Sequence, residues 1–221
     1  MERVALGMLA RSDRAAEPLL DRILDIVAPS FDGVEILYDE GRRIDDYAAA
    51  RNRVITRATE AGYDWLFMLD SDEAMFPADI AKVRALMTRE RNLIVLPRHE
   101  FVCDFAHHDP TGYPDYQARV FRLRAGYRYR RRVHEGLFRG ILPLSEMRLG
   151  HGLRSDDTPI YHYGRLTGAP AMELKLLNYD RIARGEAPLD ALPAEVQVRK
   201  DDGFWTKCEP FSGPHPLEDA S

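Results

Sequence analysis

One segment constrains the fold of this chain more than any other. Residues 64–70 read DWLFMLD, an almost continuous apolar run of strand length, and SDE follows directly at residues 71–73. Such a run is typical of a strand that is buried on both faces of a parallel sheet. Its carboxyl end is the place where open α/β sheets bind ligands. We therefore expect a functional site at Asp70, Asp72 and Glu73.

Strand and helix patterns alternate through the first hundred residues. Apolar runs at residues 3–10, 34–39 and 92–97 predict strands, and residues 15–28, 46–62 and 77–90 have helical patterns. Asp45 and Asp46 form a good N-cap pair, and Gly62 is a natural helix end. This alternation predicts an open α/β sheet flanked by helices.

The alternation stops near His99. Residues 99–117 are polar, aromatic and rich in turn residues, which predicts an active-site loop. Short strands of a mixed half are expected within residues 118–124 and 127–138, and a last helix ends near Gly185. Residues 186–221 predict an extended C-terminal tail that packs on the body or on a partner. The chain contains no internal repeat.

Composition excludes several classes of protein. Hydrophobic residues make up 45% and charged residues 30%, and the net charge of -5 disfavours a nucleic-acid binder over the whole surface. Cys103 and Cys208 cannot build a disulfide framework or a four-ligand zinc site. The sequence has no signal peptide and no apolar run of 18 residues, so we expect a cytoplasmic protein without a transmembrane segment.

The acidic residues after the apolar run form a candidate metal site. Asp70 and Asp72 are one residue apart, so on an extended strand end they point to the same side and reach one hard cation. Mn²⁺ or Mg²⁺ there would bridge donor phosphates and neutralise a leaving diphosphate. The alternative is that Asp72 or Glu73 caps the following helix.

Three segments together resemble a known family. LDSDE after an apolar strand, ARN on the preceding helix and RVHEGL downstream are similar to the family-2-type glycosyltransferases of GT-A fold, in particular the small bacterial or phage members that decorate surface polysaccharides. The resemblance covers roughly residues 3–180. It implies a GT-A-like domain at residues 1–185, with a nucleotide-binding half at 1–98 and an acceptor half at 99–185, followed by the tail.

The resemblance also implies roles for individual residues. Asp39 would contact the nucleotide base, and Arg51 would lie near the nucleotide, whereas the plain alternatives are a turn-forming aspartate and a solvated helix arginine. Glu135 would be the general base that deprotonates the acceptor hydroxyl in an inverting reaction. Its neighbour His134 would orient that base, contact the acceptor, ligate metal or be structural.

The segment PIYHYGR adds a candidate ligand. His162 would be a third metal ligand or a phosphate contact, because imidazole binds Mn²⁺ well beside carboxylates. The alternative is a buried histidine that hydrogen-bonds to the backbone. Lys175, on the helix that follows, would neutralise the diphosphate.

A run of arginines admits two interpretations. Either the side chains are the exposed face of two strands, or some of them, with Arg130 and Arg132 as candidates, bind donor or acceptor phosphates. His107 would line the acceptor cleft. The run consists of Arg119, Arg122, Arg124, Arg128, Arg130, Arg131 and Arg132, interleaved with aromatic residues.

The expected partners are a UDP-, GDP- or dTDP-sugar donor and an acceptor glycan or other hydroxyl compound. The arginine run leaves open an acceptor in DNA, namely a hydroxymethylated base. A metal-dependent phosphatase or nucleotidyltransferase and a non-catalytic nucleotide-binding module are the rival functions. The sugar, the nucleotide and the oligomeric state stay open.

Overall fold

The structure of the chain is a computed structural model. It describes residues 2–13, 17–41, 43–102, 104–143, 152–166, 169–193 and 209–218. Cys103, Cys208 and most of the proline-rich stretch after residue 193 lie outside the described residues. None of the described helices is long and apolar enough to cross a membrane.

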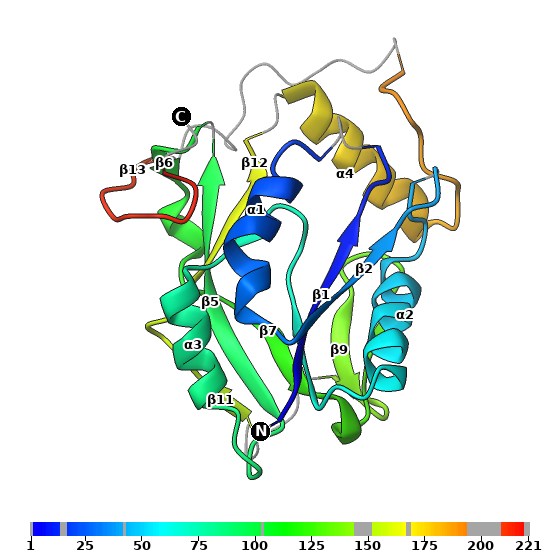
Figure 1. Cartoon of the computed structure of the whole chain (residues 1–221). Coiled ribbons are helices and arrows are strands. Elements are labelled where there is room, and N and C mark those ends of the chain that lie inside the picture. The colour runs from blue at the N-terminus through cyan, green and yellow to red at the C-terminus, as the bar shows by residue number, and fades with distance from the viewer. Residues whose placement is uncertain are drawn as a thin grey trace.

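A mixed sheet forms the centre of the molecule (Figure 1). Strand β1 (Val4–Ala10) lies between β2 (Gly33–Tyr38) and β3 (Trp65–Met68), and all three are parallel. Strand β7 (Asp115–Arg122) runs antiparallel and separates β3 from β5 (Leu93–Val102). The two halves of the chain therefore share one sheet, which confirms the predicted mixed α/β class.

The far side of the sheet is built on β5. Strands β11 (Gly152–Arg154) and β12 (Ile160–Arg165) pair with β5 in parallel. Strand β12 also pairs antiparallel with the short β4 (Glu73–Ala74), which places His162 opposite Glu73. The acidic segment after β3 is thus joined to a strand ninety residues later by backbone hydrogen bonds.

Helices cover both faces of the sheet (Figure 1). Helices α1 (Leu20–Val27) and α3 (Pro77–Ala85) pack with the even-numbered side chains of β1, and α2 (Tyr47–Glu60) packs with the odd-numbered ones. Successive strand residues face opposite sides, so this division follows from the period of the strand. Gly7 allows α2 to come close, since a Cβ there would lie 2.8 Å from Val54 Cγ1.

Helix boundaries agree with the sequence in part. The Asp46 side chain accepts a hydrogen bond from Ala49 N and begins α2, and Gly62, with φ +75°, follows its end, as predicted. Helix α1 begins only at Leu20, two residues after Pro18, and α3 ends at Ala85 rather than near residue 90. Both helices are shorter than their apolar patterns.

The expected loop at residues 99–117 is partly strand. Strand β5 continues to Val102, because Phe101 and Val102 are fully buried, and β7 already begins at Asp115. Between them lie β6 (His107–His108) and a 3-10 turn (Pro110–Gly112). Of the aromatic residues that predicted a loop, Phe101 is a core residue of β5, whereas Tyr113 is exposed and lies outside the strands.

The remaining elements lie at the edges. Strands β8 (Tyr127–Arg130), β9 (Gly136–Arg139) and β10 (Leu142–Pro143) form a small antiparallel sheet, and α4 (Ala169–Ala183) follows β12. Short 3-10 turns lie at Ala28–Ser30 and Leu123–Ala125. In the tail, β13 (Glu209–Pro210) pairs with β6, and Leu217 is fully buried, so this part of the tail packs on the body.

Candidate functional site

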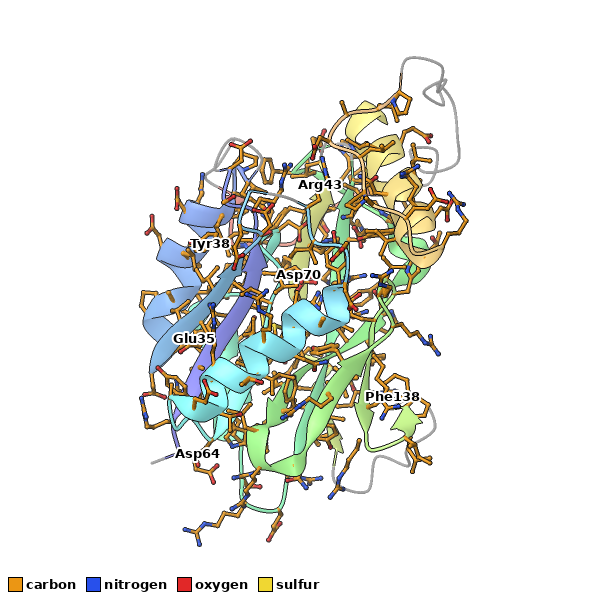
Figure 2. The ribbon with its side chains drawn as sticks, turned by 90° about the vertical axis from the view of Figure 1, so that its right-hand side faces the viewer. Glu35, Tyr38, Arg43, Asp64, Asp70 and Phe138 are labelled. Atoms are coloured by element: carbon orange, nitrogen blue, oxygen red, sulfur yellow. The ribbon has the colours of Figure 1, made fainter. Side chains whose placement is uncertain are left out.

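A cavity of 1220 Å³ opens at the carboxyl ends of the parallel strands. Its wall includes Ala10 at the end of β1, Asp39 after β2 and Asp70 after β3. Figure 2 shows Asp64 and Asp70 at opposite ends of β3, with Arg43 beyond Asp70 on the side of α4. The cavity therefore lies at the sheet edge that the acidic segment predicted.

Asp70 is held by two buried arginines. Arg51 Nη2 on α2 lies 2.5 Å from Asp70 Oδ1, and Arg119 Nη2 on β7 lies 2.8 Å from Oδ2. Burial by itself would raise the pKa of Asp70, but the two guanidinium groups outweigh it and hold the pKa well below its usual range. Both oxygens of this carboxylate are thus occupied by protein donors.

Asp72 faces a histidine instead. His162 Nε2 lies 3.3 Å from Asp72 Oδ1, and His162 Nδ1 lies 2.7 Å from Glu100 Oε1 on β5. Burial lowers the pKa of His162, but the carboxylates of Asp72 and Glu100 outweigh it and raise the pKa to about 10. With this raised pKa the ring carries a proton on both nitrogens, so a cation could bind Nε2 only by displacing the proton there.

Asp72 and His162 lie close enough together to share one divalent cation once Nε2 has lost its proton. Adjacent ligands of one ion at about 2.1 Å lie about 3 Å apart, close to the 3.3 Å between His162 Nε2 and Asp72 Oδ1. Glu100 on Nδ1 supplies the outer carboxylate that usually orients a ligating histidine. Gly164 keeps this space open, since a Cβ there would lie 2.5 Å from His162 Nε2 and 2.6 Å from Asp72 Oδ2.

The described residues contain no cluster of three histidine, cysteine or acidic side chains that could hold a metal ion by themselves. Mg²⁺ in proteins is usually held by one or two carboxylates, with phosphate and water oxygens as the other ligands. A cation at Asp72 and His162 would therefore depend on a phosphate-bearing ligand. Each oxygen of Asp70 already accepts a hydrogen bond from an arginine, so a cation at Asp70 would share this carboxylate with Arg51 and Arg119.

The helix-cap alternative for the acidic segment does not hold. Helix α3 begins after Phe76, and no side chain caps it. Glu73 is fully buried in β4, and its Oε1 accepts hydrogen bonds from Arg119 Nη2 at 2.5 Å and Arg98 Nη1 at 3.4 Å. Glu73 thus lies beneath the cavity, paired with two of the arginines that line it.

Glu135 lies on the opposite wall of the cavity. Its Oε1 accepts a hydrogen bond from Arg51 Nε at 2.7 Å, and none of the described residues donates to Oε2. The segment is not the strand that the sequence predicted, because residues 131–135 form bends between β8 and β9, with φ +78° at Arg131 and +50° at His134. Alternation along a strand therefore does not apply, and His134 and Glu135 both line the cavity.

Asp39 holds the loops at the rim. Asp39 Oδ1 accepts hydrogen bonds from Ser12 N at 2.8 Å, Ser12 Oγ at 2.7 Å and Gly41 N at 3.4 Å. Burial raises the pKa of Asp39, but these hydrogen bonds outweigh it, so the pKa is lowered. Arg11 Nε lies 3.6 Å from Oδ2, so this oxygen also has a cationic neighbour.

Lys175 and aromatic rings complete the wall. Lys175 on α4 lines the cavity and makes no ion pair with any described residue. Tyr179, from the same helix, packs edge-on against His134 with ring centroids 5.3 Å apart and against Tyr47 at 6.1 Å. The Tyr129 hydroxyl is buried at the cavity and has no hydrogen-bond partner in the described part of the chain.

The arginine run divides between core and surface. Arg119 and Arg122 are buried, whereas Arg128 and Arg130 point outward from β8. Arg131 lines the cavity, but Arg130 and Arg132 do not, since Arg130 Nη2 binds the Gly140 carbonyl and Arg132 lies 3.9 Å from Asp46. His107 lies outside the cavity on β6, 2.7 Å from Asp104.

The structure adds functional residues that the sequence interpretation did not assign. They share a buried or half-buried position on β5, β7 or β12 and direct contact with the acidic residues. For the three charged residues, the residue type was the only indication in the sequence, since an arginine or glutamate inside an apolar strand needs a partner of opposite charge. They are Arg98, Glu100, Arg119 and Gly164.

No protein-family model matches the chain. The chain is 28% identical over 189 residues to a TPR repeat-containing protein of Synechococcus elongatus, which covers 75% of this chain and 43% of that protein. The chain thus spans less than half the length of this relative. The described residues of this chain form an α/β sheet and not the stacked helix pairs of a TPR repeat.

Proposed function

We propose that the chain is a cytoplasmic, metal-dependent glycosyltransferase of GT-A type that uses a UDP-, GDP- or dTDP-sugar. The observation that carries the proposal is the pair Asp72 and His162 at the end of β3, with the carboxylate of Glu135 in the wall of the same cavity. The pair suits a cation that binds a diphosphate, and Glu135 suits a base. The resemblance of LDSDE, ARN and RVHEGL to the family supports the same function.

The cavity has the size and charge that such a substrate needs. Ligand pockets usually measure roughly 300–1,000 Å³, so 1220 Å³ accommodates a donor together with part of an acceptor. Lys175 and Arg131 line it beside the acidic residues and would bind phosphate oxygens. Asp39 at the rim would meet the base or ribose through Oδ2.

The proposed reaction is a direct displacement with inversion. Glu135 Oε2 takes the proton of the acceptor hydroxyl, the hydroxyl oxygen attacks the anomeric carbon, and the bond to the diphosphate breaks. Arg51 donates to Glu135 from Nε and to Asp70 from Nη2, on the same edge of its guanidinium, and so orients the base. Mn²⁺ or Mg²⁺ held by Asp72 and His162 would stabilise the negative charge of the departing diphosphate.

The rival phosphatase function is less well supported. A nucleophilic aspartate needs an unoccupied carboxylate oxygen, whereas both oxygens of Asp70 are paired with arginines. For DNA as acceptor, the exposed arginines Arg130 and Arg132 lie outside the cavity. We therefore place a glycan or another small hydroxyl compound first among acceptors.

The deciding experiment follows release of nucleoside diphosphate from a panel of UDP-, GDP- and dTDP-sugars, with Mn²⁺ or with a chelator. We expect metal-dependent release with one nucleotide and its loss, by about three orders of magnitude, in Asp72→Asn. A thermal-unfolding midpoint near that of the unmodified chain would show that Asp72→Asn is folded. Release that is equal with metal and with chelator would overturn the metal assignment.

A further inference from the structure

The two walls of the cavity are joined by a continuous row of ion pairs. Acidic side chains and cationic ones alternate along it, and each contacts the next within 3.6 Å. The row begins at the proposed base and ends at the proposed metal ligand. Its members, in order, are Glu135, Arg51, Asp70, Arg119, Glu73, Arg98, Glu100, His162 and Asp72.

Glu73 is the central member and the only one that cannot touch a ligand. It is 0% exposed and does not line the cavity, unlike its neighbours Arg119 and Arg98. Glu73 Oε1 accepts from both arginines, at 2.5 Å and 3.4 Å, and Oε2 accepts from Asp70 N at 3.0 Å. Removing its charge would leave two cavity arginines without the carboxylate between them.

Each half of the row orients one functional group. Toward the acceptor side, Arg119 and Arg51 fix both oxygens of Asp70, and Arg51 fixes Glu135. Toward the donor side, Arg98 contacts Glu100 at 3.6 Å, and Glu100 holds His162 Nδ1. Ion pairs that share members act as a unit, since moving one charge moves the position of the next.

We infer that Glu73 is a positioning residue that couples the two walls, so that the orientation of the base and of the metal-binding pair depends on a carboxylate whose oxygens bind neither, although the Glu73 backbone pairs with that of His162. The inference rests on the proposed function for its catalytic readout. The coupling between the ion pairs can also be tested by stability measurements, which need no enzymatic turnover.

The test compares Glu73→Gln with a matched control, Glu2→Gln. Glu2 also pairs with a buried arginine, Arg122, at 2.7 Å and 3.0 Å, but at the opposite end of the sheet from the cavity. We expect both variants to lower the thermal midpoint. Only Glu73→Gln should lower kcat, by about 10- to 100-fold with little change in the donor KM, and weaken Mn²⁺ binding.

A double-mutant cycle separates coupling from simple destabilisation. Shifts in the urea midpoint for Glu73→Gln and Glu135→Gln should fail to add, although these residues make no contact, whereas those for Glu2→Gln and Glu135→Gln should add. Additive shifts with unchanged kcat and Mn²⁺ affinity would overturn the inference. If the protein turned over no donor but the double-mutant cycle were still non-additive, the proposed function would be wrong and the coupling through Glu73 would stand.

Discussion

Strand β7 carries two buried arginines that serve different ends of the molecule. Arg122 donates from all three of its side-chain nitrogens: Nε binds the Arg91 carbonyl, Nη1 and Nη2 bind both oxygens of Glu2, and Nη2 also binds Thr88 O. Arg119 binds Asp70 and Glu73 through Nη2 alone, and its Nε is buried without a partner in the described part of the chain. In the Arg122 cluster each guanidinium nitrogen has a hydrogen-bond partner, whereas in the Arg119 cluster, beside the cavity, a buried donor has none among the described residues.

The two arginines differ in whether their buried donors have partners. A satisfied buried ion pair stabilises one conformation and needs nothing more, as the ring of Trp65 over Arg122 at 4.6 Å also indicates. Unpaired buried donors are costly in a fold that has no use for them. Arg51 Nη1, Arg119 Nε and the Tyr129 hydroxyl share this state at the cavity, which is consistent with the function proposed for that end of the sheet.

The largest effect we expect is on turnover, and it is confined to the cavity cluster. Glu135→Gln should lower turnover by about 10²- to 10⁴-fold, because the amide cannot take the acceptor proton. Steady-state kinetics on the donor found in the panel would measure it. Glu186→Gln, which alters a surface pair with Arg181 and Arg184, is the control and should be neutral. If Glu135→Gln raised only the acceptor KM, Glu135 would have a binding role.

Replacing each arginine by methionine tests the comparison directly. Arg119→Met should cost about 3–5 kcal/mol of unfolding free energy, because it leaves the fully buried Glu73 with one weaker partner. Arg122→Met should cost less, about 2 kcal/mol, because the Glu2 side chain is 30% exposed and can turn to water. Urea denaturation measures both. If Arg119→Met and Arg122→Met lost the same unfolding free energy and the same turnover, the two arginine clusters would not differ in function.

A smaller effect is expected from closing the space beside the metal-binding pair. Gly164→Ala should weaken Mn²⁺ binding by about 10- to 100-fold, because the new methyl group would overlap His162 Nε2 and Asp72 Oδ2. Isothermal titration of Mn²⁺ in the presence of the nucleoside diphosphate measures the affinity. Gly112→Ala is the control, since a Cβ at Gly112 meets no atom within 4 Å. Unchanged affinity in Gly164→Ala would place the cation elsewhere.

The smallest effect concerns a buried cluster that contains neither arginine. The His99 ring stacks on Tyr113 with centroids 3.9 Å apart, and burial, with a smaller contribution from His108, lowers the pKa of His99 to about 4. The unfolded chain binds this proton near pH 6.5, so stability should fall as pH drops from about 6.5 to 4 and level off below. Thermal midpoints of His99→Gln should depend less steeply on pH in this window. If the thermal midpoint depended on pH equally steeply in His99→Gln and in the unmodified chain, the lowered pKa of His99 would be wrong.

The sequence determined the class of the fold and the location of the site. Apolar runs and helix caps are local signals, and they were sufficient for β1, β2, β3, α2 and the end of α4. The placement of Asp70 and Asp72 at a strand exit followed from the same run of residues. These features depend on near neighbours in the chain, so a linear pattern contains them.

Tertiary structure alone decided which charges meet. The insertion of β7 between β3 and β5 brings Arg119 to Asp70, and the pairing of β12 with β4 and β5 brings His162 to Asp72 and Glu100. The same insertion divides one arginine run into buried and exposed members. The orientation of buried charges is set by partners forty to ninety residues away, because a charge leaves water only where an opposite charge already lies.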